Sequence, residues 1–301
     1  MSTTKTFLES HLPFTFAHAS VTGRDHIRSG KNNHDGFCVI HQHNATIAVV
    51  TDGCGSGSQH ENTTNHNEIG AVLGARLVCS EVLRALNNYA PESQHLLFDH
   101  QNHWEWREGI PGRVCVKLSA LITSMEVEDR AIFVQDHLLF TIVGVLMTAT
   151  HAAFFSLGDG AMVINGEHLP LEIAEANSPP YLAYRLVKTS LPPQSLILTV
   201  NRVIATNDLH HFLLATDGIA HLQRHESDML PGTDSPIGPV SQFWTEERYV
   251  MNRDALRRRL SAIATDVVRM NNLGTAIARN PGLLPDDTTV ILGKRNEVCE
   301  Q

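Results

Sequence analysis

The stretch IAVVTDG at residues 47–53 joins a run of apolar and β-branched residues directly to Asp52 and Gly53. Runs of this kind, bounded by glycine or aspartate, are typical of buried β-strands. The pattern recurs in FFSLGDG at residues 154–160 and in FLLATDG at residues 212–218. In DDTTVIL, residues 286–292, the aspartates stand before the apolar run instead. Four predicted strands therefore carry an aspartate at one end.

Any one of these aspartates has a simple structural interpretation. Asp-Gly is a common turn after a strand, because glycine adopts positive φ and aspartate bonds to its own backbone. Four such positions, far apart in the chain and each next to an apolar strand, favour a different interpretation. A strand end holds a side chain rigidly, as a metal ligand requires. We therefore expect these carboxylates to meet in a single site.

An all-carboxylate site indicates a particular chemistry. Oxygen ligands without histidine or cysteine select hard cations, so Mg²⁺ or Mn²⁺ is expected rather than Zn²⁺. Two such ions ~3.5 to 4 Å apart can activate a shared water and clamp both oxygens of an in-line displacement. Phosphate monoesters need this help, because enzymes accelerate their hydrolysis by up to ~10²¹, whereas general acid-base catalysis supplies only ~10² to 10⁴. The pattern predicts phosphoester hydrolysis.

The remaining elements follow from hydrophobic periodicity. Strands are predicted at Thr15–Val21, Gly36–His41, Thr46–Thr51, Leu138–Ala149, Ala152–Leu157, Ala161–Asn165, His211–Thr216 and Thr288–Leu292. Helices are predicted at Glu68–Leu86, Arg113–Met125 and Arg253–Met270, and a loop at Pro231–Pro239. This order predicts antiparallel sheets covered by helices on their outer faces.

Composition limits the alternatives. With 301 residues, 42% of them hydrophobic, the chain is expected to fold as a single domain over residues 1–301. A net charge of −9 argues against a nucleic-acid partner, which would require a clustered basic surface. The five cysteines include no C-x-x-C pair, so we expect neither a disulfide framework nor a zinc site.

Two further observations concern location. The N-terminal segment contains Glu9 and His11 where a signal peptide would be apolar, so a cytoplasmic protein is expected. The long apolar stretch 138–155 contains several threonines and Gly144. We interpret this stretch as two buried strands joined near His151, and we expect no membrane partner.

Several motifs together resemble a known family, the metal-dependent serine/threonine protein phosphatases of type 2C, in its bacterial branch. The resemblance covers nearly the whole chain, and the motifs occur in the family's order: His26–Gly30, Asp35–Phe37, Val49–Gly57, Ile69–Ala71, Ser156–Gly160, Ala215–Gly218 and Asp286–Val290. It implies an α+β fold, a four-layer α-β-β-α sandwich of two antiparallel sheets flanked by helices, with the metals at one end between the sheets.

The resemblance also implies ligand roles. Asp52 would bridge two metals, and the Gly53 carbonyl would bind the second of them. Asp217 and Asp286 would hold the first metal. Asp35 would bind or orient a metal-bound water, which makes it a catalytic residue together with the three other aspartates.

Two motifs at the edge of this set are less defined. Asp159 matches a residue that, in many bacterial members, helps to hold a looser third metal. The segment 177–182, NSPPYL, resembles a loop of the same branch, and its role is left open.

The chain departs from the family pattern near Asp35. The arginine that usually contacts the substrate phosphate is replaced by Gly30, which leaves Arg28 or Lys31 as candidates unless both are solvated loop cations. The acidic residue that commonly precedes Asp35 is replaced by His34, either a metal ligand or a neutral neighbour of the ligands.

Other departures concern the remaining motifs. The histidine that follows Asp-Gly in some members is Cys54 here, either a reactive thiol or a small buried hydrophobic residue. His221 replaces an aspartate that supports the third metal, which weakens the expectation of a third metal at Asp159. The polar segment Gln59–Asn67, with His60 and His66, is interpreted as a loop without a metal.

The leading hypothesis is Mn²⁺- or Mg²⁺-dependent hydrolysis of phosphoserine and phosphothreonine by a metal-bridging water, without a phosphoenzyme intermediate. The expected partner is a phosphorylated protein, for example a serine/threonine kinase, in signal transduction. A first alternative is a catalytically inactive regulator with the same fold that binds a kinase or a phosphoprotein. A second is a metal-dependent phosphodiesterase, which the acidic net charge argues against.

Overall fold

The computed structural model describes residues 12–55, 65–99, 109–171, 179–188, 196–252, 254–270 and 276–296. Within these residues the chain forms two five-stranded antiparallel sheets and a separate two-stranded hairpin. The first sheet has the order β1-β12-β9-β6-β7, with strands Phe14–Val21, Thr288–Arg295, His211–Ala215, Ala161–Ile164 and Glu167–Leu169. The second sheet has the order β2-β3-β4-β5-β8, with strands Asp35–Gln42, Ala45–Asp52, Ile142–Thr148, His151–Leu157 and Thr199–Ala205.

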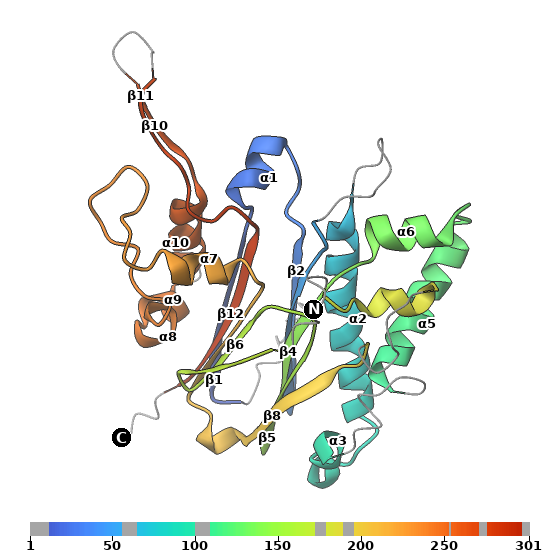
Figure 1. Ribbon diagram of the computed structural model, residues 1–301. Coiled ribbons are helices and arrows are strands. Elements are labelled where there is room, and N and C mark those ends of the chain that lie inside the picture. The colour runs from blue at the N-terminus through green and yellow to red at the C-terminus, as the bar shows by residue number, and fades with distance from the viewer. Residues whose placement is uncertain are drawn as a thin grey trace, which may run out of the picture.

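Helices cover the outer face of each sheet, and Figure 1 shows the resulting four layers. The second sheet is covered by α2 (Asn67–Leu86), α5 (Ile110–Ser124) and α6 (Arg130–His137). The first sheet is covered by α7 (Ile219–Arg224), α8 (Gln242–Thr245), α9 (Arg248–Met251) and α10 (Ala255–Ala264). Three short helices, α1 (Arg24–Ser29), α3 (Leu96–Asp99) and the 3₁₀ helix η2 (Leu182–Leu186), lie at the ends of the layers or against α5 and α6. The predicted α-β-β-α sandwich is confirmed.

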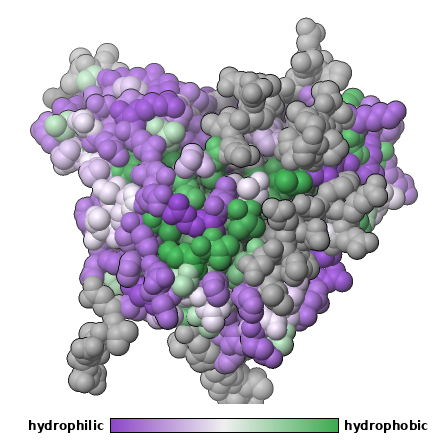
Figure 2. All heavy atoms as spheres, turned by 60° about the horizontal axis from the view of Figure 1, so that its bottom comes forward, coloured by the Kyte–Doolittle hydropathy of each residue, from purple (hydrophilic) through white to green (hydrophobic). Residues whose placement is uncertain are grey.

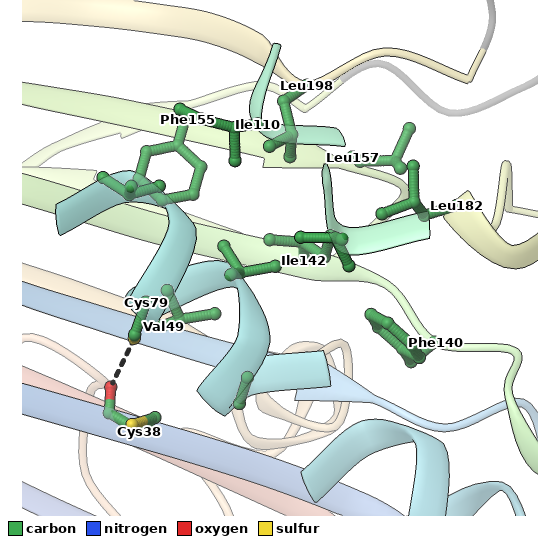
Figure 3. Packing of buried hydrophobic residues seen from close by; sticks show 14 of the residues in the cluster. Cys38, Val49, Cys79, Ile110, Phe140, Ile142, Phe155, Leu157, Leu182 and Leu198 are labelled. Carbon is green, nitrogen blue, oxygen red and sulfur yellow. Dashed lines mark hydrogen bonds between the residues drawn. The ribbon is translucent and has the colours of Figure 1, made fainter. Parts of the chain in front are cut away.

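Three hydrophobic clusters correspond to the three layer boundaries. The largest lies between the second sheet and its helices, where Figure 3 shows Val49, Ile142 and Phe155 of the strands facing residues of α2, α5 and η2. A second cluster joins α7–α10 to the first sheet. The third lies between the sheets and contains Phe154 and Phe212, whose rings meet edge to face at 5.7 Å. Burial of apolar area at these boundaries stabilises the layers.

The third predicted helix, Arg253–Met270, is wrong in its second half. Helix α10 ends at Ala264, and the chain continues as β10 (Val267–Met270), which pairs with β11 (Ala276–Asn280). Thr265 already has extended backbone angles. The β-branched pair Val267-Val268 then favours a strand over a helix. Arg253 itself lies outside the described residues.

Other predicted boundaries shift by a few residues, and some elements were not predicted. The strand predicted from Leu138 starts at Ile142, because Leu138 is still the C-cap of α6. The edge strands β7 and β8 were missed, as were the helix α6 and several short helices. The helix predicted from Arg113 begins at Ile110, where Pro111 occupies the first turn.

The apolar stretch 138–155 forms two strands, β4 and β5, that pair across a turn before His151, as predicted. No helix among the described residues is long and apolar enough to cross a membrane. Figure 2, tilted so that the lower end in Figure 1 comes forward, shows an apolar area bordered by hydrophilic residues. The aspartates predicted to form the site lie at the other end, near α1 and the start of β2.

Candidate active site

Two of the predicted site residues face each other across a strand pair. Asp35 is the first residue of β2 and Asp52 the last of β3, and the antiparallel register places them directly opposite. Side chains in such positions lie on the same face with Cβ atoms ~4.5 to 5.5 Å apart, where like charges are destabilising. The hairpin β2-β3 therefore brings two carboxylates together at one end of the second sheet.

Asp35 also connects the two sheets. Its side chain, 6% exposed, accepts a hydrogen bond of 2.8 Å from the hydroxyl of Thr216, at the end of β9 in the first sheet. Thr216 in turn bonds to the backbone of Thr289 in β12. Burial raises the pKa of Asp35 well above its ordinary range, and the charge of Asp287 adds to this, although the Thr216 and Thr289 hydroxyls oppose it.

Asp52, Asp217 and Asp286 form the centre of the site with Asp159. Burial raises the pKa of Asp52 well above its ordinary range, and the charges of Asp35, Asp217, Asp286 and Asp159 raise it further. Asp217 shares a side-chain hydrogen bond with Asp52. Carboxylates that influence one another this strongly lie close together. The structure thus brings together the five predicted aspartates from both sheets.

The turn interpretation fails for the Asp-Gly pair at 52–53, whereas Asp217 and Gly218 lie in a turn that leads into α7. Gly53 forms a β-bridge with Phe140, and a Cβ atom on Gly53 would lie 2.7 Å from the backbone oxygens of both Asn67 and His34. Gly218 has φ −51° and precedes α7, and a Cβ atom there would lie 2.0 Å from the Asp287 carbonyl oxygen. Both glycines are required because other backbone segments approach them closely, so that the adjacent aspartates reach the common site.

Asp159 lies in a bend between β5 and β6. The flanking Gly158 and Gly160 have φ values of +90° and +132°, which side-chain-bearing residues rarely adopt. One carboxylate oxygen of Asp159, Oδ1, is buried and has no hydrogen-bond partner among the residues that the structure describes. Burial raises the pKa of Asp159. A buried carboxylate oxygen without a partner is costly unless a cation or a proton satisfies it.

The adjacent residues Asp286 and Asp287 have different functions. Asp286 is exposed and contributes to the electrostatics of Asp52 and Asp217. Asp287 is 2% exposed and accepts hydrogen bonds from the backbone N–H groups of Gly23 and His34 and from His26 Nδ1. Asp287 therefore ties the start of α1 and the start of β2 to β12.

The residues present fit a pair of hard cations. Donor atoms of His26, Asp286 and Asp287 lie within 4.8 Å of one another, and a second group of carboxylates surrounds Asp52. Burial raises the pKa values of Asp35, Asp52 and Asp217 most, and the charges of neighbouring aspartates raise them further. Oxygen-rich sites of this type suit Mg²⁺ or Mn²⁺.

The repulsion predicts how the stability of the metal-free protein depends on pH. Burial and the charges of Asp286 and Asp159 raise the pKa of Asp217 to about 6, whereas in an unfolded chain it is ~3.9. Between these values the folded protein binds more protons than the unfolded chain, so stability falls as pH rises through the interval.

In chelator, the melting temperature of the wild type should therefore fall more between pH 4.5 and pH 7 than that of Asp217→Asn. The asparagine variant removes the titrating group and keeps its shape, so that other titrations cancel in the comparison. An identical pH dependence in both proteins would contradict the repulsion.

His34, at the position of the family's acidic residue, is buried and directed toward helix α2. Its Nε2 lies 3.7 Å from Glu68 Oε2, and its Nδ1 is buried without a hydrogen-bond partner. Its ring lies 4.8 Å from that of His26. Burial lowers the pKa of His34, with the charge of His26 as the next cause. His34 therefore faces Glu68 of α2, an acidic neighbour that the sequence did not indicate.

The proposed phosphate-contacting cations lie on the surface. Arg28 makes a two-pronged ion pair with Asp266, with N–O distances of 2.7 to 3.0 Å. Lys31 is exposed, and its charge influences His26 and His34. His221 lies on α7, 3.3 Å from Arg224 Nη1. Arg28 is thus engaged by another segment in this structure.

Parts of two predicted segments cannot be placed. Residues 59–64 of the loop Gln59–Asn67, including His60, lie outside the described residues, as do Asn177 and Ser178. His66 is described, and its Nδ1 lies 3.1 Å from Glu68 Oε1.

The residues that support the site, Thr216 and Asp287, were not predicted from the sequence. Thr216 stands next to Asp217 and Asp287 next to Asp286, so both lie within motifs that had been recognised. Their hydrogen bonds reach residues 181 and up to 264 positions away in the chain, which no local pattern reveals. Tyr181 lies in the segment whose role was left open.

Comparisons with known proteins agree with this architecture. A family profile described as protein phosphatase 2C matches residues 22–262. The structure of a bacterial serine phosphatase with an arginine-to-glutamate substitution has a TM-score of 0.51 at 15% identity, covering 95% of this chain and 99% of the other. One with an arginine-to-alanine substitution has a TM-score of 0.50 at 15% identity, covering 95% and 100%. The serine/threonine phosphatase Stp1 from Staphylococcus aureus has a TM-score of 0.47 at 15% identity, covering 98% and 99%. A search of curated proteins gives no match.

Proposed function

Because the chain belongs to the protein phosphatase 2C family, we propose that it hydrolyses phosphoserine and phosphothreonine in proteins with two Mn²⁺ or Mg²⁺ ions. The observation that carries this proposal is the convergence of Asp52, Asp217 and Asp286: burial raises the pKa values of Asp52 and Asp217, and the charge of Asp286 raises both further. Such a cluster is favourable only when cations or protons neutralise it. The substrate we propose is a phosphorylated protein, including a partner serine/threonine kinase.

Each residue has a role in this proposal. Asp52 would hold both cations, Asp217 and Asp286 would hold the first, and the Gly53 carbonyl would hold the second. Asp35, fixed by Thr216, orients the attacking water. The cations, when bound, neutralise charge on the phosphate and lower the pKa of water. Asp159, with its unpartnered Oδ1, is the candidate ligand for a third cation.

The test is release of phosphate from a phosphoserine peptide by the purified chain. Activity should require Mn²⁺ or Mg²⁺ and should disappear when a chelator is added, because the carboxylates supply no electrophile of their own. Calorimetry should show at least two cations per chain, with binding that weakens in Asp217→Asn. Equal rates with Mn²⁺, with chelator and in the variant would eliminate the proposal.

Other results of the same assay identify the alternatives. A protein that binds Mn²⁺ and the phosphopeptide without releasing phosphate would be an inactive regulator with a phosphatase fold. The buried His34 and the glycine at position 30 are the features that favour it. A protein that cleaves a phosphodiester faster than a phosphopeptide would be a phosphodiesterase.

A further inference from the structure

The loop that begins at Pro179 borders the carboxylate site. Pro179 Cβ lies 3.5 Å from the position that a Cβ atom on Gly158 would occupy, next to Asp159. Tyr181 precedes η2, is 5% exposed and packs edge to face on the ring of Tyr184 at 5.5 Å. The adjoining Leu182 is fully buried in the cluster beneath α2 and α5. Pro179 therefore places this segment beside the bend that carries Asp159, and packing within the segment holds the Tyr181 ring in place.

The hydroxyl of Tyr181 lies at the edge of the core cluster, against the segment that follows Asp52. It is hydrogen-bonded to the side chain of Cys54, two residues after Asp52. Burial raises the pKa of Tyr181 well above its ordinary range, and Cys54, Asp52 and Asp159 raise it further. A phenol is neutral at pH 7, with an ordinary pKa of about 10, and its hydroxyl donates a hydrogen bond.

Two hydrogen-bond donors of the family pattern are replaced in this sequence. Gly30 and Cys54 stand where the family pattern has an arginine and, in some members, a histidine. Arg28 is engaged by Asp266. A phosphate group that develops charge during hydrolysis is stabilised by fixed donors as well as by cations. Tyr181 lies on the Cys54 side of the site, where this sequence has a thiol in place of the histidine of some family members.

We propose that Tyr181 is a catalytic residue that contacts the substrate: its hydroxyl leaves Cys54 and donates a hydrogen bond to an oxygen of the bound phosphate. This proposal rests on the proposed phosphatase function. The donor is neutral and fixed by packing, so it stabilises developing negative charge without proton transfer. Loss of one such donor lowers kcat by about a hundredfold in comparable sites.

The test uses Tyr181→Phe, which removes the hydroxyl and keeps the ring. The matched control is Tyr184→Phe, from the 3₁₀ helix that Tyr181 precedes. Kinetics on a phosphoserine peptide are measured with Mn²⁺, and binding of Mn²⁺ and of inorganic phosphate by calorimetry. In Tyr181→Phe, kcat should fall about a hundredfold and phosphate should bind more weakly, whereas Mn²⁺ affinity should match the wild type. Tyr184→Phe should match the wild type in all three measurements.

The outcomes separate this proposal from the proposed function. Wild-type kinetics and phosphate affinity in Tyr181→Phe would overturn the role of Tyr181 while the phosphatase activity stands. A parallel loss of Mn²⁺ affinity would also overturn it, because Tyr181 would then only position the carboxylates. If the wild type releases no phosphate from the peptide, the proposed function fails. Phosphate affinity then decides for Tyr181: weaker binding in Tyr181→Phe supports the contact, and equal binding overturns it.

Discussion

Replacing Asp52 with asparagine should lower phosphopeptide hydrolysis by at least about 10³-fold, equivalent to about 4 kcal/mol of transition-state stabilisation. Asp52 lies at the centre of the site, since four other carboxylates influence it. An asparagine keeps the shape of the side chain but offers one weakly basic oxygen in place of a carboxylate that can bridge two cations. Steady-state kinetics with saturating Mn²⁺ measure the effect.

The same substitution should raise the melting temperature of the metal-free protein. In chelator, Asp52 is repelled by Asp35 across the strand pair and by Asp217, Asp286 and Asp159. Removal of one charge relieves that repulsion, so the inactive variant should be the more stable protein until Mn²⁺ is added.

The control for Asp52→Asn is Asp208→Asn, an exposed aspartate in the 3₁₀ helix Thr206–Asp208. It removes the same charge from a position outside the site, and it should change neither activity nor melting temperature. If Asp52→Asn lost activity together with stability in chelator, misfolding would explain the loss, and the assignment of Asp52 to a cation site would lose its support.

The sequence predicted the convergence of the aspartates because each one is tied to a strong local signal. An apolar strand that ends in aspartate fixes the place of that side chain at the end of a sheet. The register of β2 and β3 then places Asp35 opposite Asp52, as short hairpins do. Local patterns thus predicted most strands of the two sheets and the candidate ligands.

The parts that were not predicted depend on pairing between distant segments. The edge strand β8 has an uneven burial pattern, and its partner β5 precedes it by more than forty residues. The hairpin β10-β11 lies outside the sandwich, so it does not show the apolar pattern of a core strand. Its sequence continues from α10 with Arg269 and Met270, which helices accommodate as well as strands do.

The supporting contacts of the site were hidden for the same reason. Glu68 stands in the first turn of α2, where an acidic residue is explained by the helix dipole alone. Only the structure shows that His34 lies 3.7 Å from it. The proposed role of Tyr181 could not be predicted either, because its hydroxyl contacts Cys54, which lies more than a hundred residues away in the sequence.

Substitution of Asp287 and of Asp286, neighbours in the chain, should have opposite consequences. Asp287→Ala removes the acceptor for Gly23 N–H, His34 N–H and His26 Nδ1. Two buried N–H groups then lack partners, which costs ~1 to 3 kcal/mol each. We therefore expect the free energy of unfolding to fall by about 3 to 5 kcal/mol. Denaturant unfolding in chelator measures this loss, and activity falls with it because β2 begins at Asp35.

Asp286→Ala should leave the metal-free protein as stable as the wild type or more so, because the side chain is exposed and repels Asp52 and Asp217. Among the described residues, the only hydrogen bond that the Asp286 side chain accepts is from the backbone N–H of the adjacent Asp287. Its effect should appear in calorimetry as weaker Mn²⁺ binding, since the first cation loses a ligand. If both variants lost the same stability in chelator and kept wild-type Mn²⁺ affinity, the doublet would be a purely structural clamp. The first cation would then have to be held by Asp52 and Asp217 alone.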